Sequence, residues 1–154
     1  MTVPKEEYGR LGKLRESNVV LPDGSYMASV EAFHQMHCVN LLRKYSYLEY
    51  YLEHEPEFFQ SPMLRTHTDH CIEMLRQTIM CSADLHIITY DWVEKVDWPW
   101  PDFSISRNCR NYEALHDWAL ERTIAVGSED GLIAKPAGVP LRPLDDTEHT
   151  GHPH

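Results

Sequence analysis

The stretch His34-Gln35-Met36-His37-Cys38-Val39-Asn40-Leu41-Leu42-Arg43 recurs without a gap as His67-Thr68-Asp69-His70-Cys71-Ile72-Glu73-Met74-Leu75-Arg76. Both histidines, the cysteine, the second leucine and the arginine are identical in the two copies. Chance is a poor explanation for two His-x-x-His-Cys motifs in one short chain. We therefore interpret the two copies as an internal structural repeat.

Each copy lies in a segment that carries the signals of a helix. Residues 29–54 contain neither Pro nor Gly, and Pro56 marks the end of the first helix. Ser61 and Pro62 have the pattern of an N-cap followed by Pro in the first turn, so a second helix is predicted from there to about Asp84. The sequence therefore predicts a mainly α fold, a small helical domain in which two pseudo-symmetric motif helices pack together.

Shorter elements flank this pair. An apolar stripe predicts a third helix over residues 109–123. Residues 18–21 and 26–30 are β-like runs around a Pro-Asp-Gly turn, which predicts a small hairpin. Residues 85–92 are rich in β-branched and aromatic side chains and predict a strand or an extended arm, whereas the Trp-Pro-Trp-Pro stretch at 98–101 is expected to be a loop.

The same signals divide the chain into three segments. Residues 1–18 are expected to form an extended lead-in, and residues 19–125 the helical domain. Residues 126–154, rich in Gly, Pro and charge, are expected to form a loosely ordered tail.

The motif histidines fall on the apolar face of each predicted helix. Positions i, i+3, i+4 and i+7 share a face, so His34 and His37 continue into the apolar stripe of the first helix, and His67 and His70 into that of the second. If the helices pack antiparallel about a pseudo-two-fold axis, the two histidine pairs converge.

A cluster of four imidazoles has two interpretations. Buried without partners, each ring costs a few kcal/mol on typical scales, and a metal ion offsets that cost by using the ring nitrogens. The alternative is a hydrogen-bonded structural cluster. We expect a metal held by His34, His37, His67 and His70, which are also the candidate catalytic residues. Imidazole sites suit zinc, copper, iron and nickel, but few carboxylates share the face, which disfavours a two-His-one-carboxylate iron site.

The four cysteines leave several alternatives open. Cys38 and Cys71 occupy equivalent places and are candidates for a disulfide between the helices, for metal ligands or for small core residues. Cys81 and Cys109 are candidates for a second disulfide that fastens the third helix. We favour disulfides over thiolate ligands.

Composition limits the class of protein. The 154 residues are 42% hydrophobic and 25% charged, which fits one globular domain. The net charge of −10 and the absence of a basic cluster argue against nucleic acid as a partner. No apolar run reaches the roughly 20 residues of a membrane span, and residues 1–15 are too polar for a signal peptide. We expect a cytoplasmic protein, or a domain of the secretory lumen whose anchor lies outside this chain.

With these flanks, the doubled motif resembles the UstYa-like family of fungal natural-product tailoring enzymes. The likeness covers about residues 20–122 and rests on the two motifs and on Phe33-His34-Gln35, Leu75-Arg76-Gln77, Met80-Cys81-Ser82-Ala83-Asp84 and Cys109-Arg110-Asn111-Tyr112. The sequence departs from the family pattern at Leu85, His86 and Asn108, and it lacks the N-terminal membrane helix of many members.

The resemblance implies work on secondary metabolites such as mycotoxins, often ribosomally made cyclic peptides. It implies oxidative cyclisation, hydroxylation or halogenation, with both motifs forming the active site and copper as the metal in some members. Carried over by position, the site residues are His34, His37, Cys38, His67, His70 and Cys71.

Three functional hypotheses follow. The first is a copper-dependent oxidase acting on a peptide or another small molecule, with zinc or iron as alternative metals. The second is a non-redox cyclase, dehydratase or isomerase in which the histidine pairs act as general acid and base. The third is a non-catalytic module stapled by zinc that binds a pathway enzyme. A homodimer or a heterodimer with such an enzyme is also expected.

Overall fold

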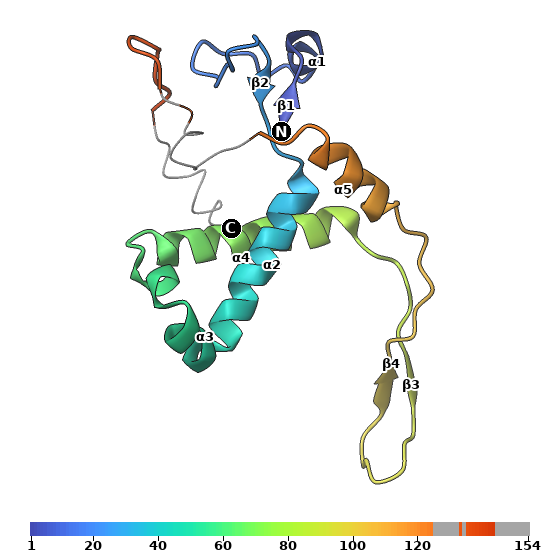
Figure 1. The fold of residues 1–154 in the computed structure, drawn as a ribbon. Coiled ribbons are helices and arrows are strands. Elements are labelled where there is room, and N and C mark those ends of the chain that lie inside the picture. Colours follow the sequence, from blue (N-terminus) through green and yellow to red (C-terminus); the bar gives the residue numbers. More distant parts are fainter. Residues whose placement is uncertain (125–132, 134, 144–154) are drawn as a thin grey trace.

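The computed structural model describes residues 1–124, 133 and 135–143 (Figure 1). This part of the chain is mainly helical, as predicted, and carries two small antiparallel strand pairs. Its elements are β1 (Thr2–Val3), α1 (Lys5–Arg10), β2 (Tyr26–Met27), α2 (Glu31–Ser46), α3 (Leu48–His54), the 3-10 helix η1 (Pro56–Gln60), α4 (Leu64–Ser82), β3 (Thr89–Asp91), β4 (Trp100–Asp102) and α5 (Tyr112–Leu120).

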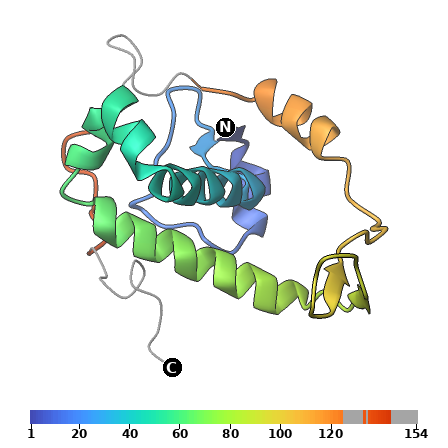
Figure 2. The ribbon, with the colours of Figure 1, turned by 90° about the horizontal axis from the view of Figure 1, so that it is seen from below.

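The two motif helices, α2 and α4, cross and make the main helix–helix contact (Figures 1 and 2). Cys38, Leu41 and Cys71 are buried at the crossing, and none of these three side chains is more than 1% exposed. Half-buried side chains of Leu42, Tyr45, Phe58 and Leu75 surround them. The predicted packing of two similar helices is therefore confirmed, and the core lies within the repeat.

The first predicted helix is shorter than expected, because it breaks at Tyr47 (φ −118°, ψ 44°). Two tertiary contacts accompany the break. Lys44 pairs with Glu55, and its ammonium lies 4.6 Å from the centre of the Phe58 ring. The turn thus brings α3 and η1 back towards the core, and Leu52 on α3 is 47% exposed.

The second motif helix begins and ends close to the predicted limits. The chain turns at Ser61, whose carbonyl accepts from the Leu64 amide at 3.1 Å, and α4 begins at Leu64 instead of at Pro62. The expected N-cap at Ser61 is therefore wrong, because Met63 occupies that position. It ends at Ser82, since Ala83 adopts a left-handed conformation (φ 40°) that stops a helix.

Residues 1–18 were expected to form an extended lead-in. This is wrong in part, because the helix α1 forms within them. The predicted hairpin is present but small: Val20 bridges Tyr26, and Gly24 (φ 82°) supplies the left-handed turn. The strand β2 pairs mainly with β1, a pairing between distant segments that no local pattern indicates. The division of the chain at residues 19 and 125 stays a prediction.

The strands β3 and β4 form an arm that projects from the helices (Figure 1). The expected arm at 85–92 is therefore confirmed, but the loop expected at 98–101 is wrong in part, because β4 includes Trp100 and Pro101. Pro101 is tolerated because a two-stranded ribbon has only edge strands. At the base of the arm, Arg107 pairs with Asp84 at 2.9 Å.

The third predicted helix is confirmed as α5, beginning three residues later than expected. Asn111 caps it, since its side-chain oxygen accepts from the Ala114 amide at 3.0 Å. The expected loose order of the tail falls mostly on residues 125–132, 134 and 144–154, outside the described part of the chain. Within the described residues, no helix has the length and hydropathy to span a membrane.

Candidate metal centre

The structure brings all four motif histidines together in two pairs. The rings of His34 and His70 have centroids 5.4 Å apart, and those of His37 and His67 lie 5.1 Å apart. A shift of 33 residues, the offset of the repeat, turns one pair into the other. The same shift of 33 residues relates Cys38 to Cys71, which lie in contact between the two histidine pairs. The pseudo-two-fold axis expected from the repeat therefore passes between these two cysteines.

His37 and His67 have the geometry of two ligands of one ion. Their Nε2 atoms lie 3.2 Å apart, and the Cys71 sulfur completes a set whose ligand atoms all lie within 4.8 Å of one another. Two nitrogens about 2.0–2.1 Å from one metal at a tetrahedral angle would be separated by roughly 3.3 Å. These residues therefore fit a transition metal without rearrangement of either helix.

The other pair carries an orienting carboxylate that the sequence interpretation missed. Glu31 lies one turn before His34, and its Oε1 is 3.2 Å from His34 Nδ1. His34 Nε2 faces inward, 3.8 Å from the Cys38 sulfur. A carboxylate on one ring nitrogen fixes the ring and raises the basicity of the other nitrogen, as is common behind metal-binding histidines. The i, i+3 spacing of Glu31 and His34 was the available signal.

Burial keeps the Cys71 thiol protonated. Burial, followed by the hydrogen bond and charge interaction with Cys38, raises the pKa of Cys71 to about 12. The folded chain therefore holds this proton more tightly than the unfolded chain, whose thiol has a pKa near 9. This contribution to stability is complete below pH 9 and is lost as the pH rises towards 12. The imidazole nitrogens are consequently the groups that could bind a metal without losing a proton. Cys71 could bind it only if the metal displaced the thiol proton.

All four cysteines are free thiols in the structure. Cys38 and Cys71 are buried in contact, whereas Cys81 and Cys109 are exposed near the end of α4 and the start of α5. Both expected disulfides stay predictions.

If the four cysteines are the free thiols of the structure, iodoacetamide at pH 8 labels Cys81 and Cys109 at least about 100-fold faster than Cys38 and Cys71. The thiolate is the reactive form, and the inner pair is shielded from solvent while the high pKa of Cys71 keeps its thiolate scarce. Mass spectrometry of peptides over a time course measures the four rates.

Denaturant without reductant provides the control. Labelling of Cys38 and Cys71 after unfolding supports free thiols. Labelling that appears only after reduction would instead show a disulfide, and fast labelling in the folded chain would contradict the buried pair.

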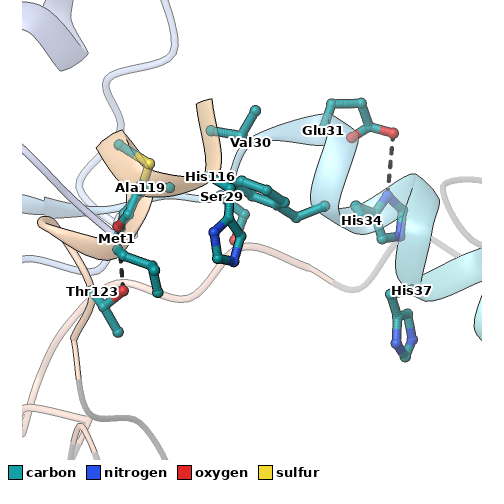
Figure 3. A pocket seen from close by; sticks show the side chains of 11 residues that line it. Met1, Ser29, Val30, Glu31, His34, His37, His116, Ala119 and Thr123 are labelled. Atoms are coloured by element: carbon teal, nitrogen blue, oxygen red, sulfur yellow. Dashed lines mark hydrogen bonds and ion pairs between the residues drawn. The ribbon is translucent and has the colours of Figure 1, made fainter. Parts of the chain in front are cut away.

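A cavity of about 570 Å³ opens beside the histidines (Figure 3). It lies between the start of α2 and the end of α5, and the N-terminal segment closes one side. His34 and His37 line it from α2, and His116, which the sequence interpretation did not single out, lines it from α5. The candidate metal centre is thus open to a ligand on one side.

Comparisons with known proteins identify relatives of this chain. A family model described as "Mycotoxin biosynthesis protein UstYa" matches residues 1–122. The chain is 37% identical over 142 residues to the UstYa family oxidase aprY of Aspergillus flavus, covering 84% of this chain and 42% of that protein. It is 35% identical over 109 residues to the UstYa family oxidase phomYc' of Diaporthe leptostromiformis, with coverages of 68% and 42%.

A third relative carries a different name. The chain is 32% identical over 114 residues to the transacylase cctO of Talaromyces islandicus, covering 68% of this chain and 37% of that protein. The chain therefore spans less than half the length of these relatives. No solved structure matches it.

Proposed function

Because the chain belongs to the UstYa family, we propose that it is a copper-dependent oxidase that modifies a fungal secondary metabolite. The reaction is an oxidative cyclisation, a hydroxylation or a related oxidation of a C–H or O–H bond in a peptide or other small molecule. The names of the relatives support an oxidase-like enzyme in such a pathway.

One observation carries the assignment of a metal: the Nε2 atoms of His37 and His67 lie 3.2 Å apart on facing helices. Two imidazoles at this separation repel if both are protonated, and share a single proton or an ion if they are not. Imidazole ligands suit copper, and an oxidation needs a redox-active metal, which zinc is not.

The residues of the chain have distinct tasks in this proposal. His37 and His67 hold the ion, and His34 and His70 provide a second, equivalent pair of nitrogens. Glu31 fixes the ring of His34, and the buried contact of Cys38 with Cys71 keeps α2 and α4 at a constant separation. Bound copper would supply one-electron oxidation with dioxygen as the electron acceptor.

A non-redox reaction is the second candidate, because the relative cctO is named a transacylase. On the same scaffold, the paired imidazoles would exchange protons with the substrate near neutral pH. This alternative needs neither dioxygen nor a redox-active metal.

Removal and return of the metal separates the two candidates. Protein stripped with a chelator is incubated in air with metabolite extract from a fungal strain that lacks this gene, and products are followed by mass spectrometry. Ascorbate is added as the electron donor, because insertion of one oxygen atom from dioxygen needs two electrons to reduce the other atom to water. We expect copper, but not zinc, to restore a product that has lost two hydrogens or gained one oxygen. Full turnover without metal, or rescue by zinc alone, would reject the oxidase. A product of unchanged composition, or one that has lost water, formed without dioxygen would support the alternative.

A further inference from the structure

We infer that the cavity between α2 and α5 is the substrate site, and that it takes an uncharged, largely apolar group that His116 positions by a hydrogen bond. This inference rests on the proposed function, since it places the substrate beside the histidine pairs. It goes further by naming the class of ligand and a residue outside both motifs.

The cavity has the size and lining of a small-molecule site. Its volume of about 570 Å³ lies within the range of roughly 300–1,000 Å³ that such sites occupy. Apolar atoms form most of the surface of its wall, and Val30, Phe33, Ala119 and Leu120 contribute apolar side chains to it. An ionised ligand would lose hydration against the apolar part of this wall. An anion would in addition face the carboxylate of Glu31, which lies in the lining.

The polar groups of the cavity come from two sides. His34 and His37 lie on successive turns of α2, and His116 approaches from α5 (Figure 3). A ligand seated against the apolar wall therefore has one part beside the candidate metal ligands and another within reach of His116. This is the arrangement that orients a substrate towards a reacting centre.

Contacts of Phe33 set the position of His116. The Phe33 ring meets the rings of His116 and Tyr112 edge to face, with centroids 6.2 Å and 6.0 Å apart. Asp117 forms only a long ion pair with this ring, since its Oδ1 lies 3.8 Å from His116 Nδ1, beyond hydrogen-bond distance. The contact with Phe33 therefore sets the position of the ring. The other ring nitrogen, Nε2, is the atom that would meet a ligand.

The probe for this inference is N-acetyl-L-phenylalaninamide, which is uncharged and combines an aromatic ring with amide hydrogen-bonding groups. Its binding to the folded chain is followed by NMR of labelled methyl groups. We expect concentration-dependent shifts at Val30, Ala119 and Leu120, and none at Leu52 on α3, which follows the opposite end of α2. N-acetyl-L-phenylalanine, the matched anion, is expected to bind at least about tenfold more weakly. Equal affinity for the two probes, or shifts absent from the cavity methyls, would overturn the inference.

Three variants test the assigned roles. Ala119→Trp fills the cavity and is expected to abolish binding, whereas Ala114→Trp, on the same helix outside the cavity, is the control and should leave it unchanged. His116→Ala is expected to weaken the probe about tenfold, the equivalent of one hydrogen bond, and His116→Gln to recover part of the loss. Unchanged affinity in His116→Ala would remove the positioning role, even if Ala119→Trp failed to fold.

This titration needs neither copper nor turnover, so its failure is distinct from failure of the oxidase proposal. Where turnover is measured, a positioning role predicts that His116→Ala raises KM more than it lowers kcat. A merely structural role would instead lower metal binding and folding stability together.

Discussion

Replacing His67 with alanine is expected to lower copper affinity at least about 100-fold and to abolish copper-dependent turnover. Changes to groups that only support metal ligands already cost about 10–100-fold in affinity or activity, so loss of a direct ligand should cost more. The Nε2 atom of His67 lies 3.2 Å from that of His37 at the candidate centre. Isothermal titration with copper and electron paramagnetic resonance measure the loss.

The matched control is His54→Ala, which removes an imidazole from α3, outside both motifs. Its Nδ1 lies 2.8 Å from the Tyr50 carbonyl on the same helix, away from the metal centre. This variant should bind copper as the unchanged chain does. If His67→Ala bound copper with full affinity, the metal centre would not lie where the two helices cross.

The second large effect concerns the core. Leu41→Ala is expected to destabilise the fold by about 2–5 kcal/mol, since it removes buried methyl groups and leaves a void. Leu41 is 1% exposed and is the largest fully buried side chain among the described residues. Few other side chains are buried with it, so little remains to compensate. Urea unfolding followed by circular dichroism should show a clearly lower midpoint.

Val39→Ala gives the comparison on the same helix. Val39 is 49% exposed, so its replacement should change the free energy of unfolding by no more than about 0.5 kcal/mol. Equal midpoints for the two variants would contradict the assignment of the core to the crossing of α2 and α4.

Local pattern was sufficient to predict the parts of the fold that the repeat determines. The period of the motif residues placed Cys38 and Cys71 on facing stripes, and the structure buries both. Local pattern was insufficient where contacts between distant segments determine the structure. The break at Tyr47 accompanies the contacts of Lys44 with Glu55 and Phe58, and β2 forms by pairing with β1. Neither partner can be identified from the residues next to these elements.

The candidate site shows the same limit. Spacing alone was enough to bring the four histidines together, because both pairs lie on regular helices. His116 was not found, since it reaches the cavity through the packing of Tyr112 and its own ring against Phe33. No periodicity links α5 to α2. Glu31 could have been found, because it lies one turn from His34 on the same helix.

The crossing of α2 and α4 has the form of a symmetric dimer interface contained in one chain, where residue i meets residue j and the repeat of i meets the repeat of j. Such a symmetric interface would normally have two equivalent openings to solvent, one on each side of the helix crossing. Here α5 covers one flank only, so the histidines of α2 face the cavity while none from α4 lines it. Duplication thus doubles the candidate metal ligands. The single unrepeated helix α5 leaves this candidate centre accessible from one side, through the cavity.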